Sequence, residues 1–279
     1  MSAVLTCPAP AKLNLFLHVV GRRADGYHLL QTVFRFVDFG DVLRLDVRDD
    51  GRVERTNPLP GVPVEDDLTV RAARLLQQET GTALGVDIHL EKRLPLGGGV
   101  GGGSSDAASV LLALNRLWAL HLPRRRLQEL ALRLGADVPV FVFGQSAFAE
   151  GVGETLSAVA LEPAWYLVLV PPVSVPTAEI FAAQELTRDA NIITMADFST
   201  GYGRNDLEPV VRKRYPPVEA CLTWLARHGE ARMTGSGACV FAAFASRAEA
   251  ERVFTGRPAG VQGFVARGLD RHPLYGFAD

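Results

Sequence analysis

Hydrophobic and polar positions alternate along residues 11–20, and this pattern predicts a half-buried strand. One face of the strand would carry Leu13, Leu15, Leu17 and Val19, and the other Lys12, Asn14, Phe16 and His18. Shorter runs predict further strands over 32–37, 42–47 and 86–90, and an Asp-Gly pair predicts a turn within 22–26. The chain therefore begins with the pattern of a β-sheet.

Apolar residues then recur at helical spacing over 68–78, and a longer helix is predicted over about 104–119. Another helix is predicted to begin at Pro123 and end at Gly135, because proline is favoured in a first turn and glycine just after a last turn. Short apolar runs over 138–143 and 147–150 are interpreted as strands.

A cluster of Gly151, Gly153 and Pro163 predicts a boundary, with an N-terminal domain over 1–155 and a C-terminal domain over 156–279. The second half is predicted to contain strands at 165–170, 232–234, 239–243 and 263–267, helices at 177–184, 205–212, 217–228 and 247–254, and a loop at 186–204. This order fits a split βαβ sandwich. We expect an α+β protein with two lobes and an active site in the cleft between them.

Composition narrows the class of protein. The 279 residues carry 29 basic and 31 acidic side chains, a balance that argues against nucleic acid or an acidic membrane surface as partner. The longest apolar run, about eight residues at 238–245, is too short to span a bilayer, and the first 20 residues lack the pattern of a secretory signal. Three scattered cysteines predict neither disulfides nor a zinc site. We expect a cytoplasmic protein, and its oligomeric state stays open.

The densest chemical signal is a glycine loop. Six of the seven residues 97–103 are glycine, and Ser104, Ser105 and Asp106 follow at a predicted helix start. Glycine lets a ligand approach the main chain, and N–H groups at a helix N-terminus attract anions, so the loop predicts a phosphate site. A flexible linker is the alternative, but the loop lies between a strand and a helix. The companion residues of dinucleotide-binding, P-loop and protein-kinase motifs are missing around it.

Three separate stretches then carry a resemblance to a known family. PLGGGVGGGSSDAA at 95–108 resembles the ATP-binding motif of the GHMP kinase superfamily, PAPAKLNLFL at 8–17 its N-terminal motif, and MTGSGACV at 233–240 its C-terminal glycine-rich motif. The runs AKLNLFLHVVGRRADGYHLLQTVF, LGADVPVF and NDLE resemble the branch that acts on a cytidine diphosphate-linked methylerythritol. This likeness covers almost the whole chain. It implies a two-lobed GHMP-kinase-like fold and an ATP- and Mg²⁺-dependent phosphorylation of the substrate's 2-hydroxyl, in the non-mevalonate route to isoprenoid precursors.

The resemblance also assigns the chemistry of phosphoryl transfer to particular residues. Asp137, in GADVP, is implied as the base that takes the hydroxyl proton, with Lys12 as its electrostatic partner. Without the resemblance, the preferred interpretation of Asp137 is an ordinary turn residue, and that of Lys12 is a strand lysine that reaches toward solvent.

A cytosine pocket is implied as well. The ring of Tyr27 would stack on the base, His28 would bind its edge, and Phe181 would close the pocket from the other lobe. Asn14 and Thr177 are further implied substrate contacts. Taken alone, Tyr27 and His28 are better interpreted as a pair that packs beside a turn, and Phe181 is equally a core residue.

The implied nucleotide contacts surround the glycine loop and comprise Lys92, Pro95, Gly97, Gly98, Gly99, Gly101, Gly102, Gly103, Ser104 and Ser105. Ser105 is also the expected metal contact. In the second half, Gly235, Ser236 and Gly237 would present N–H groups to the transferred phosphate or the substrate diphosphate, or they form a plain hairpin turn. Asp67 departs from the branch, which often has Asn near the adenine.

Two other functions fit parts of the pattern. Another GHMP kinase, of the homoserine or phosphomevalonate type, would share the loop, but its substrate offers no base for Tyr27, His28 and Phe181. A non-catalytic ligand sensor on the same fold is the second alternative, and the intact Lys12, Asp137 and glycine loop argue against it.

Overall fold

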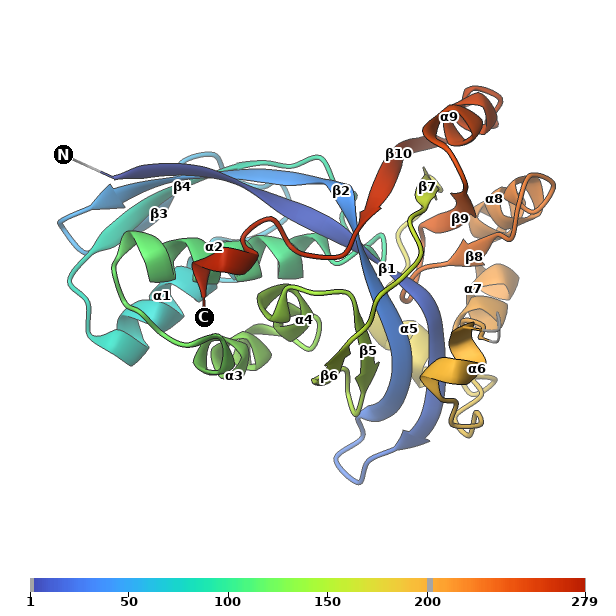
Figure 1. The fold of residues 1–279 in the computed structure, drawn as a ribbon, viewed down its shortest axis with the longest axis horizontal. Helices are drawn as coiled ribbons and strands as arrows, with labels where there is room; N and C mark the ends of the chain where they lie inside the picture. Colours follow the sequence, from blue (N-terminus) through green and yellow to red (C-terminus); the bar gives the residue numbers. More distant parts are fainter. Residues whose placement is uncertain (1–2, 200–202, 279) are drawn as a thin grey trace.

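The computed structural model describes residues 3–199 and 203–278. Two long antiparallel strands, β1 (Val4–Arg22) and β2 (His28–Arg48), run through the middle of the molecule and connect its two lobes (Figure 1). Strand β2 joins the two strands predicted over 32–37 and 42–47, so the predicted break between them is wrong. The backbone stays extended at Gly40, which lies so close to Ala9 that a Cβ atom would overlap the carbonyl of Ala9 and lie 2.6 Å from Cα of Pro10.

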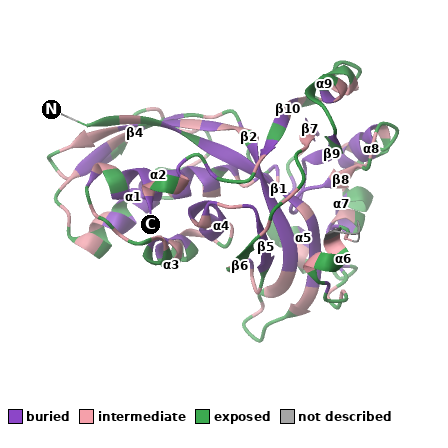
Figure 2. Cartoon of the chain, viewed as in Figure 1, coloured by how far each residue is buried: buried purple, intermediate pink, exposed green. Residues whose placement is uncertain are grey.

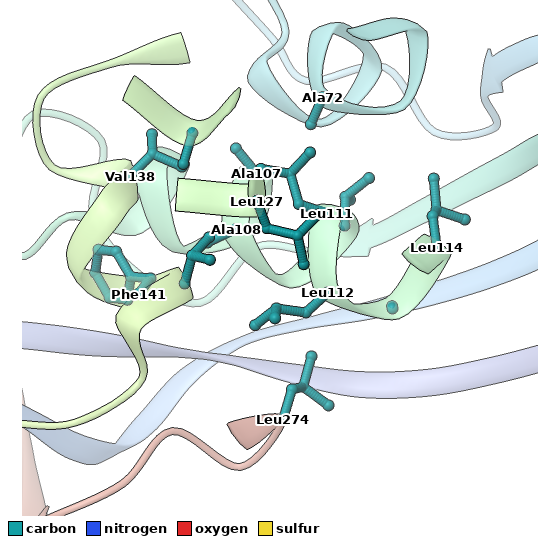
Figure 3. Packing of buried hydrophobic residues seen from close by; sticks show 14 of the residues in the cluster. Ala72, Ala107, Ala108, Leu111, Leu112, Leu114, Leu127, Val138, Phe141 and Leu274 are labelled. Carbon is teal, nitrogen blue, oxygen red and sulfur yellow. The ribbon is translucent and has the colours of Figure 1, made fainter. Parts of the chain in front are cut away.

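The first lobe packs helices against one face of the sheet (Figure 1). Its elements are β3 (Val53–Arg55), α1 (Leu68–Thr80), β4 (Gly85–Glu91), α2 (Gly102–Leu117), α3 (Arg124–Leu134), α4 (Val138–Phe143), β5 (Ala147–Glu150) and β6 (Thr155–Ala158). Helix α2 lies at the centre of this core, and Figure 3 shows its Leu111 and Leu112 among side chains from neighbouring helices. This packing fixes the N-terminal end of α2, where the glycine loop enters.

Residues 138–143, predicted as a strand, form helix α4 instead. A six-residue apolar run cannot distinguish a buried helix from a buried strand by periodicity. Local signals favour the helix, because Pro139 stands in its first turn and Gly144 ends it in the left-handed conformation, with φ at +74°. The helix packs against α2 and α3, which explains why its residues are apolar throughout.

Strand β1 is not half-buried, as its alternating pattern predicts, but buried on both faces along residues 12–14 and 16–19 (Figure 2). Lys12 and Asn14 are each 2% exposed, close to the value for Leu13. The alternation therefore separates two environments inside the protein. Leu13 packs into an apolar cluster with the second lobe, whereas Lys12 and Asn14 line an internal cleft.

The second lobe contains β7 (Trp165–Val170), α5 (Thr177–Ala182), α6 (Met195–Ser199), α7 (Glu208–Arg214), α8 (Pro216–Leu225), β8 (Arg232–Met233), β9 (Val240–Phe244), α9 (Arg247–Thr255) and β10 (Gln262–Leu269). Its strand order is β10-β7-β9-β8, with all of these pairs antiparallel. This strand order is compatible with a split βαβ sandwich, and the predicted α+β class is confirmed.

The predicted loop 186–204 contains a short helix, α6, so the loop prediction is wrong over Met195–Ser199. Thr194 and Asp197 explain its start, because the Asp197 side chain accepts from the Thr194 N–H while the Thr194 hydroxyl oxygen accepts from the Asp197 N–H. Residues 200–202 of the predicted loop lie outside the described residues.

The two lobes exchange parts of the chain. Strand β10 pairs with β7 of the second lobe and, through Gly268 and Leu269, with β2. The chain then returns to the first lobe, where Leu274 and Ala278 are buried in the core around α2. Figure 3 shows Leu274 below this helix. The division into domains 1–155 and 156–279 stays a prediction. Within the residues that the structure describes, no helix combines the length and the apolar character needed to cross a membrane.

Candidate active site

The glycine loop (residues 97–103) has a backbone that requires glycine at alternate positions. Gly97, Gly99 and Gly101 have φ values of +65°, +72° and +74°, a region that L-residues other than glycine rarely adopt. Space is restricted as well, because a Cβ atom on Gly101 would lie 2.9 Å from Cζ of Phe141 and 3.1 Å from Cε of Lys12. The loop leads directly into the 16-residue helix α2, so backbone donors and the positive end of the helix dipole face the same place.

A second glycine loop (residues 234–238) from the other lobe packs against the first. The N–H of Cys239 donates to the carbonyl of Gly98 at 3.1 Å, and the hydroxyl of Thr234 donates to the carbonyl of Gly99 at 3.2 Å. The hydroxyl oxygen of Thr234 also accepts from the backbone N–H of Asn14 at 2.9 Å. One threonine thus joins both glycine loops to β1, and Gly235 and Ser236 line the same cleft as Gly97 and Gly99.

Lys12 and Asp137 come together beside the glycine loop. Nζ of Lys12 lies 3.3 Å from Oδ2 of Asp137, with the lysine side chain 3% exposed and the aspartate 42% exposed. Asp137 stands just before helix α4, not before a strand as predicted, and α4 holds its backbone in place. The ammonium also donates to Oδ1 of Asn14 at 2.6 Å, and Nδ2 of Asn14 donates to the hydroxyl of Thr32 at 2.9 Å. Asn14 therefore fixes the position of Lys12.

These groups line one end of a continuous cleft. The inner cavity, about 340 Å³, is lined by Lys12, Asn14, Thr32, Ser104 and Asp137 together with residues of both glycine loops. The adjoining outer cavity, about 530 Å³, is lined by Tyr27 and His28, and it shares Thr177 and Phe181 with the inner cavity. A long ligand can therefore extend from the glycine loops to Tyr27 and His28.

The outer cavity contains the three aromatic residues singled out in the sequence. The rings of His28 and Phe181 lie 4.9 Å apart between centroids and are tilted by 34°, whereas Tyr27 is 62% exposed. Burial lowers the pKa of His28, and the positive charges of Arg188 and Arg22 lower it further. The imidazole is therefore neutral near pH 7. Thr177 lies between the cavities, where its hydroxyl is 2.7 Å from the hydroxyl of Ser236.

Lys92 and Ser105 occupy other places than expected. The ammonium of Lys92 donates to Asp41 at 2.6 Å and to Asp106 at 2.8 Å, beneath the N-terminal end of α2. Ser105 is fully buried, and its hydroxyl donates to the carbonyl of Pro10 at 2.7 Å. Among the described residues that line the two cavities, Ser104 is present and these two are absent. Their nucleotide and metal roles stay predictions.

Two of the remaining loop glycines, Gly98 and Gly102, lie in close contact with their neighbours. A Cβ atom on Gly98 would lie 2.8 Å from both Sγ of Cys239 and Cγ of Pro95, and one on Gly102 would lie 3.0 Å from Nζ of Lys92. A Cβ on Gly103 would meet Leu68 at an ordinary 3.6 Å, so Gly103 has the most room of the three.

Asp67, which stands where the branch often has Asn, has a structural role in this protein. Its Oδ1 accepts from the N–H of Thr69 and caps helix α1, and its Oδ2 forms a buried ion pair with Arg55 at 3.2 Å. Both oxygens are therefore engaged by the protein itself.

Several residues that shape the site were missed by sequence reasoning. Thr32 had no distinguishing signal, because it occupies an ordinary strand position. Asn205 belongs to the NDLE stretch and was singled out without a role. Its Nδ2 donates to the carbonyls of Met233 and Gly235, so it holds the second glycine loop. Arg188 lay in the segment predicted as loop.

Comparisons with known proteins agree with this geometry. The family model described as GHMP kinases N terminal domain matches residues 67–145, and the model described as GHMP kinases C terminal matches residues 183–257. Two crystal structures share the fold. That of homoserine kinase from Cytophaga hutchinsonii matches with a TM-score of 0.70 and 16% identity, over 96% of this chain and 95% of that chain. That of Methanococcus jannaschii mevalonate kinase matches with a TM-score of 0.68 and 14% identity, over 96% of this chain and 99% of that chain. The fold and the two glycine loops are those of a GHMP kinase.

More similar relatives define the family. The chain is 67% identical to 4-diphosphocytidyl-2-C-methyl-D-erythritol kinase of Thiobacillus denitrificans over 97% of each chain. It is 61% identical to the enzyme of the same name from Nitrosospira multiformis over 99% of this chain and 95% of that one. A crystal structure of 4-(cytidine 5'-diphospho)-2C-methyl-D-erythritol kinase matches with a TM-score of 0.81 and 33% identity, over 95% and 99% of the two chains. The chain belongs to the 4-diphosphocytidyl-2-C-methyl-D-erythritol kinase family.

Proposed function

We propose that this protein transfers the γ-phosphoryl group of ATP to the 2-hydroxyl of 4-diphosphocytidyl-2-C-methyl-D-erythritol. The observation that carries the proposal is the continuity of the cleft. Its inner cavity joins two glycine loops to Lys12 and Asp137, and its outer cavity offers His28 and Phe181 to a base. The names of the relatives, more than half identical over nearly the whole chain, state this substrate. They favour it over a homoserine or phosphomevalonate type of kinase.

The inner cavity suits the phosphates of ATP. Positive φ values turn the loop backbone around Gly97, Gly99 and Gly101, and the N-terminus of α2 adds orphan N–H donors. Lys12 brings a compact positive charge beside the same loop. Gly235 and Ser236 approach from the opposite lobe. A phosphate chain would therefore be neutralised and held from both sides of the cleft.

The donor set suits Mg²⁺ bound mainly through the nucleotide. Within residues 3–199 and 203–278, no three His, Cys, Asp or Glu side chains are grouped to hold a metal ion. Mg²⁺ usually keeps several waters and uses one or two carboxylates plus substrate phosphates, so a protein cage is not required. In the inner cavity, the hydroxyl of Ser104 and the carboxylate of Asp137 are the oxygen atoms that would hold the ion. When bound, the ion would neutralise charge that develops on the phosphates.

Asp137 is proposed as the general base for the substrate hydroxyl. Its carboxylate is partly open to the cleft, whereas its partner Lys12 is buried and held by Asn14. The ammonium pairs with Asp137 and adds positive charge near the attacking oxygen. Since phosphoryl transfer depends mainly on positioning and electrostatic stabilisation, the fixed geometry of Lys12 matters as much as its charge.

The proposal is tested by following ADP release from Mg-ATP with the cytidyl substrate and, in parallel, with mevalonate, phosphomevalonate, homoserine and galactose. Turnover with the cytidyl substrate alone, inhibited by CDP, is the expected result. Turnover with another alcohol would retain the roles of Lys12 and Asp137 and overturn the cytosine pocket. ATP binding without turnover of any alcohol would instead favour a ligand sensor.

A further inference from the structure

Arg188 links the two walls of the outer cavity, although it belongs to the segment between α5 and α6. Its Nε donates to Nε2 of His28 at 3.1 Å. One terminal nitrogen, NH2, donates to the carbonyls of Phe181 and Ala183 at 2.9 and 2.7 Å, and the other, NH1, donates to the carbonyl of Leu186 at 3.1 Å. The guanidinium therefore satisfies carbonyls at the C-terminal end of α5 and contacts the imidazole at the start of β2.

The contact with His28 determines where the imidazole carries its proton. Arginine has donors only, so Nε2 of His28 must accept, and the proton of the neutral ring resides on Nδ1. Within the described residues, 3–199 and 203–278, Nδ1 makes no hydrogen bond that would compete with a ligand. The lowered pKa of His28 is consistent with a neutral ring, because burial and the two arginines Arg188 and Arg22 all disfavour imidazolium. His28 is thus an N–H donor held in one tautomer.

We propose that Arg188 is a positioning residue for base recognition: it fixes His28 as an Nδ1–H donor and holds the end of α5 that carries Phe181. The inference rests on the proposed function for the identity of the base. Cytosine offers acceptors at N3 and O2, whereas N3 of uracil carries a hydrogen. Because Arg188 keeps the proton on Nδ1 of His28, this nitrogen can only donate, and it favours a base that presents an acceptor. A base that presents a hydrogen there would leave both buried groups without a hydrogen bond.

The test uses the full-length protein with Arg188→Met, which keeps much of the side-chain volume and removes every donor. We expect the inhibition constant of CDP and the KM for the cytidyl substrate to rise roughly tenfold or more, since one charged donor orders both walls. Both kcat and the KM for ATP should stay within about twofold of wild type, because the substitution weakens only the ground-state binding of the base. The preference for CDP over UDP as inhibitor should also fall.

A matched control is Arg257→Met. Arg257 likewise donates to carbonyls near a helix C-terminus, those of Phe254 and Val261, but it lies at the end of α9. This variant removes an equivalent structural contact and should leave the CDP inhibition constant unchanged. Thermal unfolding of both variants shows whether the loss of stability is comparable.

The ¹⁵N signals of the His28 ring provide a readout that a merely structural role would not change. In the wild type, Nδ1 should have the shift of a protonated nitrogen and Nε2 that of an acceptor, and in Arg188→Met the two forms should mix. An unchanged tautomer together with an unchanged CDP inhibition constant would overturn the inference. If wild-type protein does not bind CDP, the proposed substrate fails, while the ring signals still decide whether Arg188 sets the tautomer.

Discussion

Substituting Gly99 by alanine tests whether the contact between the two glycine loops is required for phosphoryl transfer. Gly99 has a φ of +72°, and a Cβ atom there would overlap the carbonyl oxygen of Thr234 and lie 2.9 Å from that of Gly237. The obstructing atoms belong to the backbone of the opposite loop. They cannot rotate away as a side chain would, so the loops themselves must separate.

The magnitude has two parts that can be measured separately. The positive φ alone costs an alanine about 1–2 kcal/mol, partly offset by the smaller entropy of the unfolded chain. Gly260 and Gly61 isolate this part, since their φ values are +81° and +79° and a Cβ atom at either would meet nothing within 4 Å. At Gly99 the overlap also displaces the loops by about 1 Å, and such a misplacement near the reacting groups can cost about a hundredfold in rate.

The assay compares kcat, KM for ATP and thermal unfolding for Gly99→Ala, Gly260→Ala and Gly61→Ala. The two controls should lose a few degrees in Tm and keep wild-type kinetics. Gly99→Ala should lose more stability and about a hundredfold in kcat/KM. If Gly99→Ala matches the controls in both stability and rate, close contact between the loops is not needed and our account of the cleft is refuted.

Other residues give equally direct predictions. Asp137→Asn should keep the wild-type Tm and lower kcat by about 10²–10⁴, as expected for loss of a general base, and steady-state kinetics would check this. Thr32→Val leaves the buried amide of Asn14 without its partner, so urea unfolding should show a loss of about 1–3 kcal/mol together with a lower kcat. Burial raises the pKa of Asp106 from 3.8 to about 7, against the attraction of Lys92. The folded state therefore keeps this proton where the unfolded chain has lost it, and the contribution of Asp106 to stability declines as pH rises from about 4 to about 7. Asp106→Asn should gain stability relative to wild type as the pH rises from about 4 to about 7 in urea unfolding, and a constant difference over this range would contradict the assignment.

The sequence predicted best those features that depend on local chemistry. The glycine loop and the boundaries of α1, α2 and α3 follow from periodicity, capping residues and runs of glycine. Helix α4 was mispredicted as a strand because a short apolar run has no distinguishing period. Pro139 and Gly144 are the local signals that favour a helix there. The order of strands and helices along the second lobe was predictable, and it indicated the sandwich type, although the strands lie in the sheet in another order, β10-β7-β9-β8.

The positioning residues could not be predicted in the same way, because their partners are distant in sequence. Arg188 and His28 are 160 positions apart, and Thr234 and Asn14 are 220 apart. Neither arginine nor threonine has a local pattern that reveals such a partner. The family likeness assigns Lys92 to the nucleotide, but its burial between Asp41 and Asp106 depends on how α2 packs over β2 and β4.

The exchange of segments between the lobes has a consequence for protein engineering. Leu17 and Val19 of β1 belong to the hydrophobic core of the second lobe, whereas Leu274 and Ala278 belong to that of the first. A chimera of two related kinases joined near residue 155 would therefore combine mismatched surfaces in both cores. Functional chimeras would need to take Leu17 and Val19 from the parent of the second half and the C-terminal segment from the parent of the first half, while Cys7 and Ala9 of the same strand stay with the first core. Recombination is therefore expected to favour exchange of the whole chain over exchange of halves.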